Sequence, residues 1–285
     1  MTALQAGEHA IDVSSPCVMG ILNVTADSFY DGGRVDRDAA LAHARRMLAD
    51  GARIVDVGGE STRPGATPVD EAAELARVIP IVEALARAGV CVSVDTMKPA
   101  VMRAALAAGA AMINDVRALR APGALDVVAA STAAVCLMHM QGEPRTMQAH
   151  PRYVDVVAEV REFLRERAQA CRDAGIAAER IVVDPGFGFG KTLAHNLELL
   201  RNLDDIAQLG YPVLAGLSRK SMIGAITGRD AGERLAGSVA AALAAAAHGA
   251  RILRVHDVQE TVDALAVWSA LDRWPGNLSH AGKKR

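Results

Sequence analysis

Eight short apolar segments, each followed by a segment with helical spacing, are the feature that most limits what this chain can fold into. The apolar segments lie at 17–24, 53–57, 90–94, 111–113, 134–138, 181–183, 212–215 and 251–255. Helices are predicted near 38–50, 69–88, 99–108, 123–130, 153–174, 193–204, 233–248 and 258–273. Strands that alternate with helices at this spacing form parallel sheets. Eight of them favour a closed (β/α)8 TIM barrel over the alternative, a doubly wound open sheet.

The predicted barrel occupies the chain as a single domain over residues 1–285. Barrels of this class commonly use about this length, and no break in composition divides the 285 residues. Residues 1–15 are a mixed lead-in, and the polar tail at 275–285 is expected to be disordered. Hydrophobic residues at 51% and charged residues at 22% are typical of a globular protein with an ample core.

Charge and cysteine usage narrow the class of partner. A net charge of -2 provides no attraction to nucleic acid or to a membrane surface, and no apolar run is long enough for a membrane helix. No signal-peptide pattern opens the chain. Four cysteines show no metal-ligand spacing, so we expect free thiols and a cytoplasmic protein. The expected partners are small molecules.

Polar side chains stand where the predicted strands end. In a barrel these strand ends surround one opening, here called the mouth, and active sites lie at this opening. The residues at the strand ends are Asn23, Ser61, Thr62, Arg63, Asp95, Asn114, Met138, His139, Asp184, Ser218, Arg219, Lys220, Arg254 and His256. A barrel without a function has no need of such a ring, so the sequence predicts a binding or catalytic site at this mouth.

The end of the sixth strand is the most distinctive. Asp184 precedes a loop with glycine at every second position from 186 to 190 and with Phe187 and Phe189 between them. Glycine lets a backbone approach a ligand closely, and an aromatic ring offers a flat apolar wall. A carboxylate can accept two hydrogen bonds from a planar nitrogen heterocycle. This combination is typical of a small-molecule pocket.

Two phosphate-binding motifs fail at the same loop. A P-loop requires glycine where Pro185 stands, although Gly190, Lys191 and Thr192 match its end. The dinucleotide fingerprint requires glycine where Lys191 stands.

The strand-end residues divide by chemistry. Asp95, Asn114 and Asp184 offer planar acceptors and an amide, which suit a heterocycle with several N–H groups. Arg254 and His256 together suit a phosphate or pyrophosphate. We therefore predict that one mouth binds a nitrogen heterocycle and an anion.

Two further features point to ions. Asn23 offers a neutral oxygen to a hard metal. The segment 218–221 opens a predicted helix whose free N–H groups favour an anion such as a carboxylate.

Several residues have structural interpretations. Asp56 and Asp115 are interpreted as structural acceptors. Met138 and His139 could pack rather than bind. Lys220 could form a Schiff base, although two nearby carboxylates argue against an apolar lysine site. No G-x-S-x-G elbow is present.

Taken together, these segments resemble the dihydropteroate synthases of folate biosynthesis, a family of pterin-binding TIM barrels. The resemblance covers about 18–274 and rests on 20–25, 27–29, 31–33, 51–65, 93–96, 113–115, 138–142, 184–191, 218–221 and 254–257. It implies a transferase that joins 6-hydroxymethyl-7,8-dihydropterin pyrophosphate to p-aminobenzoate and releases pyrophosphate. It also implies Mg2+, a homodimer formed through the last helices, and a target of sulfonamides.

The resemblance implies residue roles as well. Residues implied for the pterin pyrophosphate are Thr62, Asp95, Asn114, Val116, Met138, Asp184, Phe189, Gly216, Lys220, Arg254 and His256. Residues implied for p-aminobenzoate are Phe29, Arg63, Pro64 and Ser221, and Asn23 is implied for the metal. The implied catalytic residues are Asp31, Asp95, Asp184, Lys220, Arg254 and His256. Loops 25–34 and 61–67 are expected to close over the site.

One departure from the family pattern is visible. Ala26 stands where the family usually has proline, and Tyr30 where it has a small residue. These changes bear on the cost of loop closure and on sulfonamide affinity rather than on chemistry.

Two alternatives remain open. A methyltetrahydrofolate:corrinoid methyltransferase shares the pterin carboxylates but needs neither the Arg254–His256 pair nor the 218–221 segment. A non-catalytic pterin-binding paralogue would be signalled by loss of Asn23, Lys220 or Arg254, and all three are present.

Overall fold

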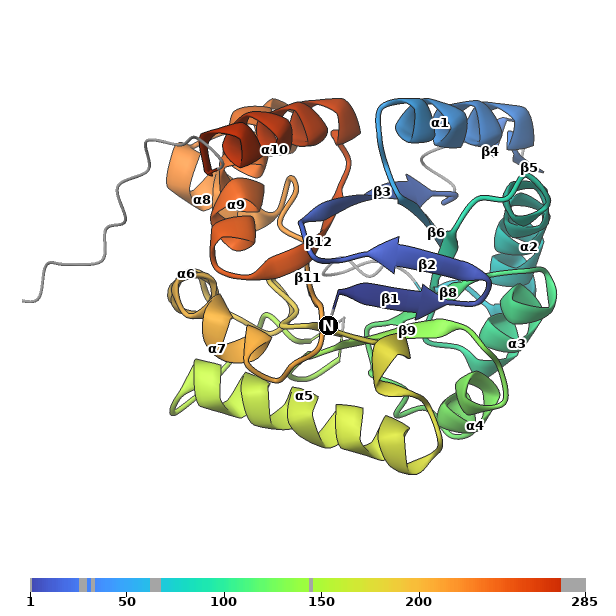
Figure 1. Ribbon diagram of the computed structural model, residues 1–285, viewed down its shortest axis with the longest axis horizontal. Helices are drawn as coiled ribbons and strands as arrows, with labels where there is room; N and C mark the ends of the chain where they lie inside the picture. Colours follow the sequence, from blue (N-terminus) through green and yellow to red (C-terminus); the bar gives the residue numbers. More distant parts are fainter. Residues whose placement is uncertain (1, 26–29, 32–33, 62–67, 144–145, 273–285) are drawn as a thin grey trace, which may run out of the picture.

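The computed structural model describes residues 2–25, 30–31, 34–61, 68–143 and 146–272, with only the backbone described at 30–31, 34–35 and 272. Eight parallel strands close into a barrel in the order β3-β6-β7-β8-β9-β10-β11-β12, with β12 pairing back to β3 (Figure 1). Their bounds are β3 (Cys17–Asn23), β6 (Ile54–Gly58), β7 (Val92–Asp95), β8 (Met112–Asp115), β9 (Ala134–Met138), β10 (Ile181–Asp184), β11 (Val213–Ala215) and β12 (Ala250–Val255). The predicted (β/α)8 barrel is confirmed.

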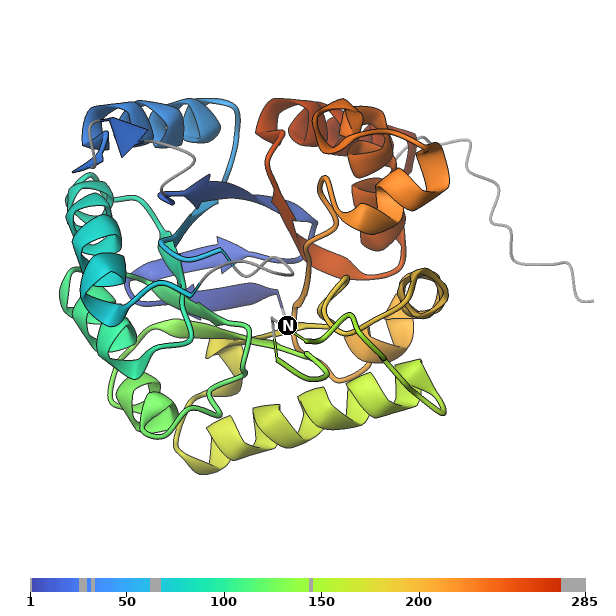
Figure 2. The ribbon, with the colours of Figure 1, turned by 180° about the vertical axis from the view of Figure 1, so that it is seen from behind.

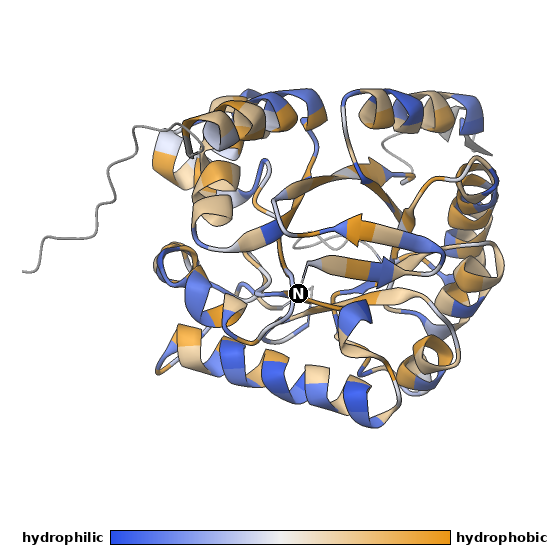
Figure 3. Ribbon diagram, viewed as in Figure 1, coloured by the Kyte–Doolittle hydropathy of each residue, from blue (hydrophilic) through white to orange (hydrophobic). Residues whose placement is uncertain are grey.

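Helices surround the barrel on its outer side (Figure 1). Their bounds are α1 (Arg37–Ala49), α2 (Glu71–Arg87), α3 (Pro99–Ala107), α4 (Ala124–Ala129), α5 (Val156–Asp173), α6 (Leu193–Arg201), α7 (Leu203–Ala207), α8 (Ser221–Thr227), α9 (Leu235–Ala247) and α10 (Val258–Asp272). Short 3-10 turns are η1 (Ala178–Arg180) and η2 (Ala231–Glu233). Figure 3 shows that helix surfaces carry the hydrophilic residues, most clearly along α5. No helix in the described ranges is both long and apolar enough to cross a membrane.

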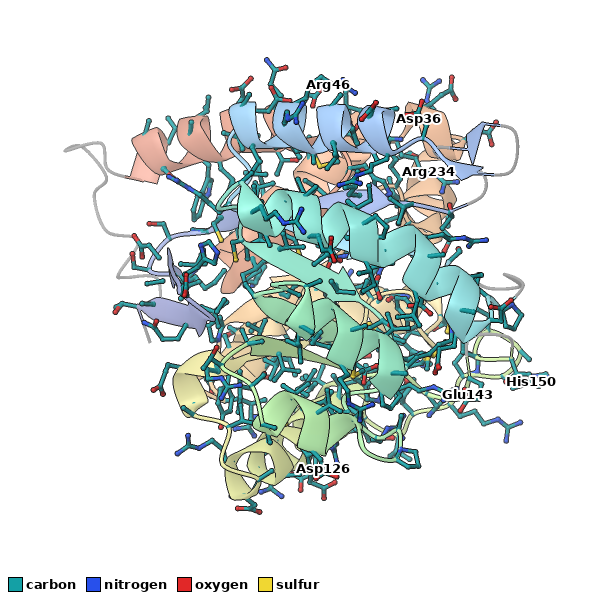
Figure 4. All side chains as sticks on the ribbon, turned by 90° about the vertical axis from the view of Figure 1, so that its right-hand side faces the viewer. Asp36, Arg46, Asp126, Glu143, His150 and Arg234 are labelled. Atoms are coloured by element: carbon teal, nitrogen blue, oxygen red, sulfur yellow. The ribbon has the colours of Figure 1, made fainter. Side chains whose placement is uncertain are left out.

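Two predicted helix boundaries were wrong. Asp36, not Asp38, caps α1, because its side chain accepts a hydrogen bond from the backbone N–H of Ala39 at 2.9 Å. Figure 4 labels Asp36 at the end of α1 near the strand ends and Arg46 nearer the other end of the helix. The helix predicted at 193–204 is interrupted at Asn202, which ends α6 and precedes α7.

The strands have one apolar side toward the barrel axis and another toward the helices, as the two-residue period of a strand requires. Side chains inside the barrel form a cluster of their own, which includes Met19, Ile54, Met112, Val182 and Ile252. A larger cluster fills the space between the strands and the helices. Because these packed side chains fill the interior of the barrel, a ligand can bind only at an end of the barrel.

The lead-in at 1–15 contains a hairpin that the sequence pattern did not indicate. Strands β1 (Ala3–Ala6) and β2 (His9–Asp12) pair antiparallel and lie across one end of the barrel (Figure 1). Leu4 is fully buried against the interior cluster. This end lies at the N-terminal ends of the strands, because the backbone N–H of Gly7 donates to the carbonyl of Thr132, just before β9. The opposite end, seen in Figure 2, carries the loops that follow the strands.

Candidate active site

Arg254 at the mouth is held by carboxylates from two other strands. Its Nε donates to Oδ2 of Asp56 at 2.6 Å, and its Nη2 donates to Oδ2 of Asp95 at 2.8 Å. Burial opposes the charge of Arg254, but the two carboxylates outweigh that effect and raise its pKa. Arg254 therefore stays charged in any accessible pH range.

Asn114 joins this group from β8. Its Nδ2 donates to the same Oδ2 of Asp56 at 3.1 Å. The other carboxylate oxygens of Asp56 and Asp95 are buried and have no hydrogen-bond partner among the described residues. A buried oxygen without a partner is costly, so these atoms are prepared to accept hydrogen bonds from a ligand.

Asp95 is the carboxylate of this group with the most altered ionisation. Burial raises its pKa to about 7, the nearby Arg254 opposes the shift, and Asp56 adds repulsion. Asp95 is therefore more readily protonated than an exposed carboxyl group.

Asp184 and Lys220 form the second charged group at the mouth. Lys220 Nζ donates to the carbonyl oxygen of Phe187 and lies 4.8 Å from the centroid of the Phe189 ring. A Cβ on Gly216 would lie 3.8 Å from Lys220 Nζ and 3.9 Å from Arg254 Cβ, so this glycine separates the two groups.

Burial governs both ionisations in this second group. It raises the pKa of Asp184, against the effects of Lys220 and of the Gly186 backbone N–H, which donates to Asp184 Oδ1 at 2.7 Å. It lowers the pKa of Lys220 to about 8, with Asp184 opposing. Lys220 is therefore mostly protonated at neutral pH and loses its charge in mildly alkaline solution.

An apolar wall lies beside these charges. Val116 and Met138, both predicted to line the site, pack with Phe189 in a small cluster apart from the main core. Met97, Met140 and Met147 belong to the same cluster and were not singled out in the sequence. Methionine side chains adapt their shape, so they suit the face of a planar ligand.

The anion side of the mouth is built from β3, β12 and the segment after β11. Asn23 ends β3, and its Oδ1 would lie 3.6 Å from a Cβ on Gly58. Ser218 Oγ and His256 Nδ1 lie 3.0 Å apart. Ser221 begins α8 and is exposed. These residues stand at the strand ends where the sequence placed them.

Some predicted residues are not described. Phe29, Thr62, Arg63 and Pro64 lie outside the described residues, as does Ala26. For Asp31 and Tyr30 only the backbone is described, in β4 (Tyr30–Asp31), which pairs with β5 (Arg34–Val35).

Two buried charged residues at the mouth were missed as site residues. Asp56 was interpreted as structural, yet it contacts both Arg254 and Asn114. Its place as an interior residue of β6, two positions before the strand ends at Gly58, was the available signal. Lys191 appeared in the two failed motifs and within the 184–191 segment of the resemblance, without a role of its own, and is 3% exposed beside the Asp184 loop. Asp115, by contrast, accepts from the backbone N–H groups of Arg117 and Leu119, as a structural acceptor does.

Comparison with known proteins decides the family. Residues 19–256 match the family model described as pterin binding enzyme. A dihydropteroate synthase from Haemophilus influenzae is 52% identical over 269 residues, which span 94% of this chain and 98% of the relative.

This chain belongs to the dihydropteroate synthase family.

Solved structures of family members agree. The Xanthomonas albilineans dihydropteroate synthase with 4-aminobenzoic acid superposes with a TM-score of 0.90 at 55% identity, covering 96% of this chain and 99% of the other. The Burkholderia cenocepacia dihydropteroate synthase complexed with 7,8-dihydropteroate superposes with a TM-score of 0.88 at 56% identity, covering 95% and 96%. The family predicted from the sequence is confirmed, and with it the class of transferase.

Proposed function

We propose that this chain joins 6-hydroxymethyl-7,8-dihydropterin pyrophosphate to p-aminobenzoate, releasing pyrophosphate and forming 7,8-dihydropteroate. The observation that carries the proposal is the convergence of Asp95, Asn114 and Asp184 with Lys220 and Arg254 at one mouth beside an apolar wall. Such a site offers acceptors to a heterocycle and cations to a pyrophosphate.

The pterin would be held by its edge and its faces. The unpartnered oxygen of Asp95 and the carboxylate of Asp184 accept from ring N–H groups. Val116, Met138 and Phe189 cover the faces of the ring. Gly216 leaves space between Lys220 and Arg254 that a larger residue would fill.

The pyrophosphate would leave toward the cationic side. Arg254 uses Nε and Nη2 on Asp56 and Asp95, and among the described contacts its Nη1 has none, so that nitrogen is the donor for a phosphate oxygen. His256, fixed by Ser218, is the second donor. Together they stabilise the negative charge that develops on the departing group.

The bond between the pterin methylene carbon and the pyrophosphate oxygen breaks first in this scheme. The resulting cation is stabilised by Asp95 and Asp184, with Asp31 of the first loop as a further carboxylate. The arylamine nitrogen then forms the new C–N bond and loses a proton. Ser221 would receive the carboxylate of p-aminobenzoate, with Phe29, Arg63 and Pro64 completing that site.

The residues fit Mg2+ bound through substrate. Asn23 offers one neutral oxygen, and no group of three His, Cys, Asp or Glu side chains suited to a metal occurs among the described residues. Mg2+ commonly takes few protein ligands and completes its shell with phosphate oxygens and water. When bound, the ion would neutralise charge on the leaving pyrophosphate.

The test is product formation from the dihydropterin pyrophosphate and labelled p-aminobenzoate. We expect labelled dihydropteroate with Mg2+ and its loss with chelator. Binding of the pterin pyrophosphate without any product would instead support a non-catalytic pterin-binding protein.

We also propose a homodimer and a cytoplasmic location. Exposed apolar residues lie on the last helices, at Ile226 of α8, Leu235 of α9 and Val267 of α10. The four cysteines are free thiols, which suits a reducing compartment. Light scattering would give the mass in solution, where a monomer at micromolar concentration would contradict the dimer. Fractionation of cells would test the location.

A further inference from the structure

The loop at 186–190 has all of its backbone carbonyl groups held by side chains. Lys191 Nζ donates to the carbonyls of Gly186 at 3.0 Å and Phe189 at 3.1 Å. The remaining three carbonyls of the loop, at 187, 188 and 190, accept from Lys220, Gln148 and Tyr153. A loop without regular structure thus keeps one shape through side-chain hydrogen bonds.

Lys191 lies beneath this loop, away from solvent. Its Nζ also lies 2.9 Å from Nδ1 of His139. Burial lowers the pKa of His139 to about 2, and the Lys191 charge acts in the same direction, so the ring is neutral and Nδ1 accepts. With the carbonyl oxygen of His139, which lies 3.4 Å from Nζ, four acceptors surround the three N–H donors of one ammonium group. Burial lowers the pKa of Lys191 to about 7, with the Asp184 carboxylate opposing the shift.

The backbone of the loop rests directly on the segment after β9. A Cβ on Gly186 would lie 1.9 Å from the carbonyl oxygen of His139, and one on Gly190 would lie 2.3 Å from that of Gln141. Both glycines have positive φ, +69° and +62°. The carbonyl groups that Lys191 binds therefore belong to a backbone segment that already touches the segment after β9 and cannot move closer to it.

The same loop also makes three contacts with two active-site residues, Lys220 and Asp184. The carbonyl of Phe187 accepts from Lys220, the Phe189 ring faces the Lys220 ammonium group, and the N–H of Gly186 donates to Asp184. Lys191 and Lys220 thus bind different carbonyl groups of the same loop. A shift of the loop moves Asp184, Phe189 and Lys220 together.

We propose that Lys191 is a positioning residue for the pterin substrate, holding the 186–190 loop in the shape that places Asp184, Phe189 and Lys220. This rests on the proposed function, in which those three residues contact the pterin. Lys191 itself touches no substrate. A displacement on the order of 1 Å in such groups can cost about 100-fold in rate.

The alternative is that Lys191 only stabilises the fold. Arg180 provides a matched control, because it makes the same kind of bond at the other end of the barrel. Its Nε donates to the carbonyl of Ala133 at 2.9 Å and its Nη2 to that of Val128 at 3.2 Å. Loss of Arg180 removes cation–carbonyl bonds far from the mouth.

The experiment compares Lys191→Met and Arg180→Met in the full chain. Steady-state kinetics are measured with each substrate, dihydropteroate binding is measured by calorimetry, and Tm is measured by thermal unfolding. We expect both variants to lower Tm. Only Lys191→Met should raise KM for the pterin pyrophosphate and Kd for dihydropteroate by about tenfold or more, with less than about threefold change in KM for p-aminobenzoate.

A Lys191→Met variant whose pterin KM and dihydropteroate Kd stay within twofold of the wild type, as in Arg180→Met, overturns the proposal. Should Lys191→Met fail to fold, His139→Phe takes its place, because it retains an aromatic ring and removes both ring nitrogens, including the Nδ1 acceptor of Lys191. A severalfold rise in KM for the pterin pyrophosphate in His139→Phe supports the proposal, and an unchanged KM overturns it. If the wild-type chain forms no product, the proposed function is contradicted. This outcome is distinct from the failure of the Lys191 proposal, which requires an active wild-type chain.

Discussion

Arg254 Nε donates to Oδ2 of Asp56 at 2.6 Å, although the two residues are 198 positions apart in the chain. Asp56 is fully buried and also accepts from Asn114. One carboxylate therefore orients an arginine and an amide that both face the mouth. A buried carboxylate between two such donors holds them in a fixed geometry.

Replacing Asp56 with asparagine tests this arrangement. Asp56→Asn keeps the shape but removes the charge, so Arg254 loses one of its two carboxylates. We expect kcat/KM for the pterin pyrophosphate to fall by roughly 10- to 100-fold, in line with about 1.4 kcal/mol per factor of ten. Asp115→Asn is the control, because Asp115 binds only backbone N–H groups among its described partners. Equal losses in both variants would contradict the role of Asp56.

The alkaline side of the pH profile should report on Lys220. Its folded pKa of about 8 lies below the ordinary value of 10.5, so the unfolded chain binds this proton more tightly than the folded chain does. Stability from this group therefore rises as pH increases from about 8 to 10.5. Binding should show the opposite trend, because the deprotonated amine no longer attracts an anion.

We therefore expect kcat/KM for the pterin pyrophosphate to decline as pH rises through about 8, while the free energy of unfolding does not decline with it. In Lys220→Arg this limb should move beyond pH 10, since the guanidinium stays protonated. A wild-type profile that stays flat to pH 9.5 would show that the charge of Lys220 is not used.

Gly186 should tolerate no side chain. In Gly186→Ala the new Cβ meets the carbonyl of His139, and the backbone has φ of +69°. The left-handed conformation alone costs about 1–2 kcal/mol, and the collision adds to it. Gly175→Ala is the matched control, with φ of +88° and no atom within 4 Å of the new Cβ. Urea unfolding should show a loss for Gly186→Ala at least twice that of the control.

The hairpin at the closed end should contribute stability and no chemistry. Leu4→Ala removes a fully buried side chain from the interior cluster, and we expect a loss of about 2–5 kcal/mol in the free energy of unfolding. KM values at 25 °C should stay within twofold of the wild type. Val154→Ala is the control for truncation, because Val154 is fully exposed. A change in KM with Leu4→Ala would mean that the two ends of the barrel are coupled.

The segments that follow β8 and β9 extend the mouth of the barrel beyond the strand ends. Figure 4 labels Glu143 and His150, both in the long segment between β9 and α5, on the side away from the β1–β2 hairpin. Arg117 of the segment after β8 forms an ion pair with Glu143. This exposed pair contributes little to stability but brings two of the mouth's segments together.

The eight barrel strands and their polar ends followed from sequence, because an apolar run and the residue that ends it are local features. Asp95, Asn114 and Asp184 stand at the ends of their strands as expected. The apolar character of Val116 and Met138 likewise predicted a wall, and the structure packs them with Phe189. The cap of α1 was misplaced by two residues, since Asp36 and Asp38 are both good capping residues and only backbone geometry distinguishes them.

What only the tertiary structure decided is which buried charges meet. Lys191 and the hairpin at residues 3–12 carry no local signal of their roles, and the place of Asp56 near the end of β6 does not identify its partners, since each role depends on groups from other parts of the chain. The sequence by itself determined the barrel and the family, because period and motif are written along the chain. The partner of a buried charge is chosen by closure of the barrel, which brings residues from distant parts of the chain within hydrogen-bond distance and removes the water that would otherwise solvate them.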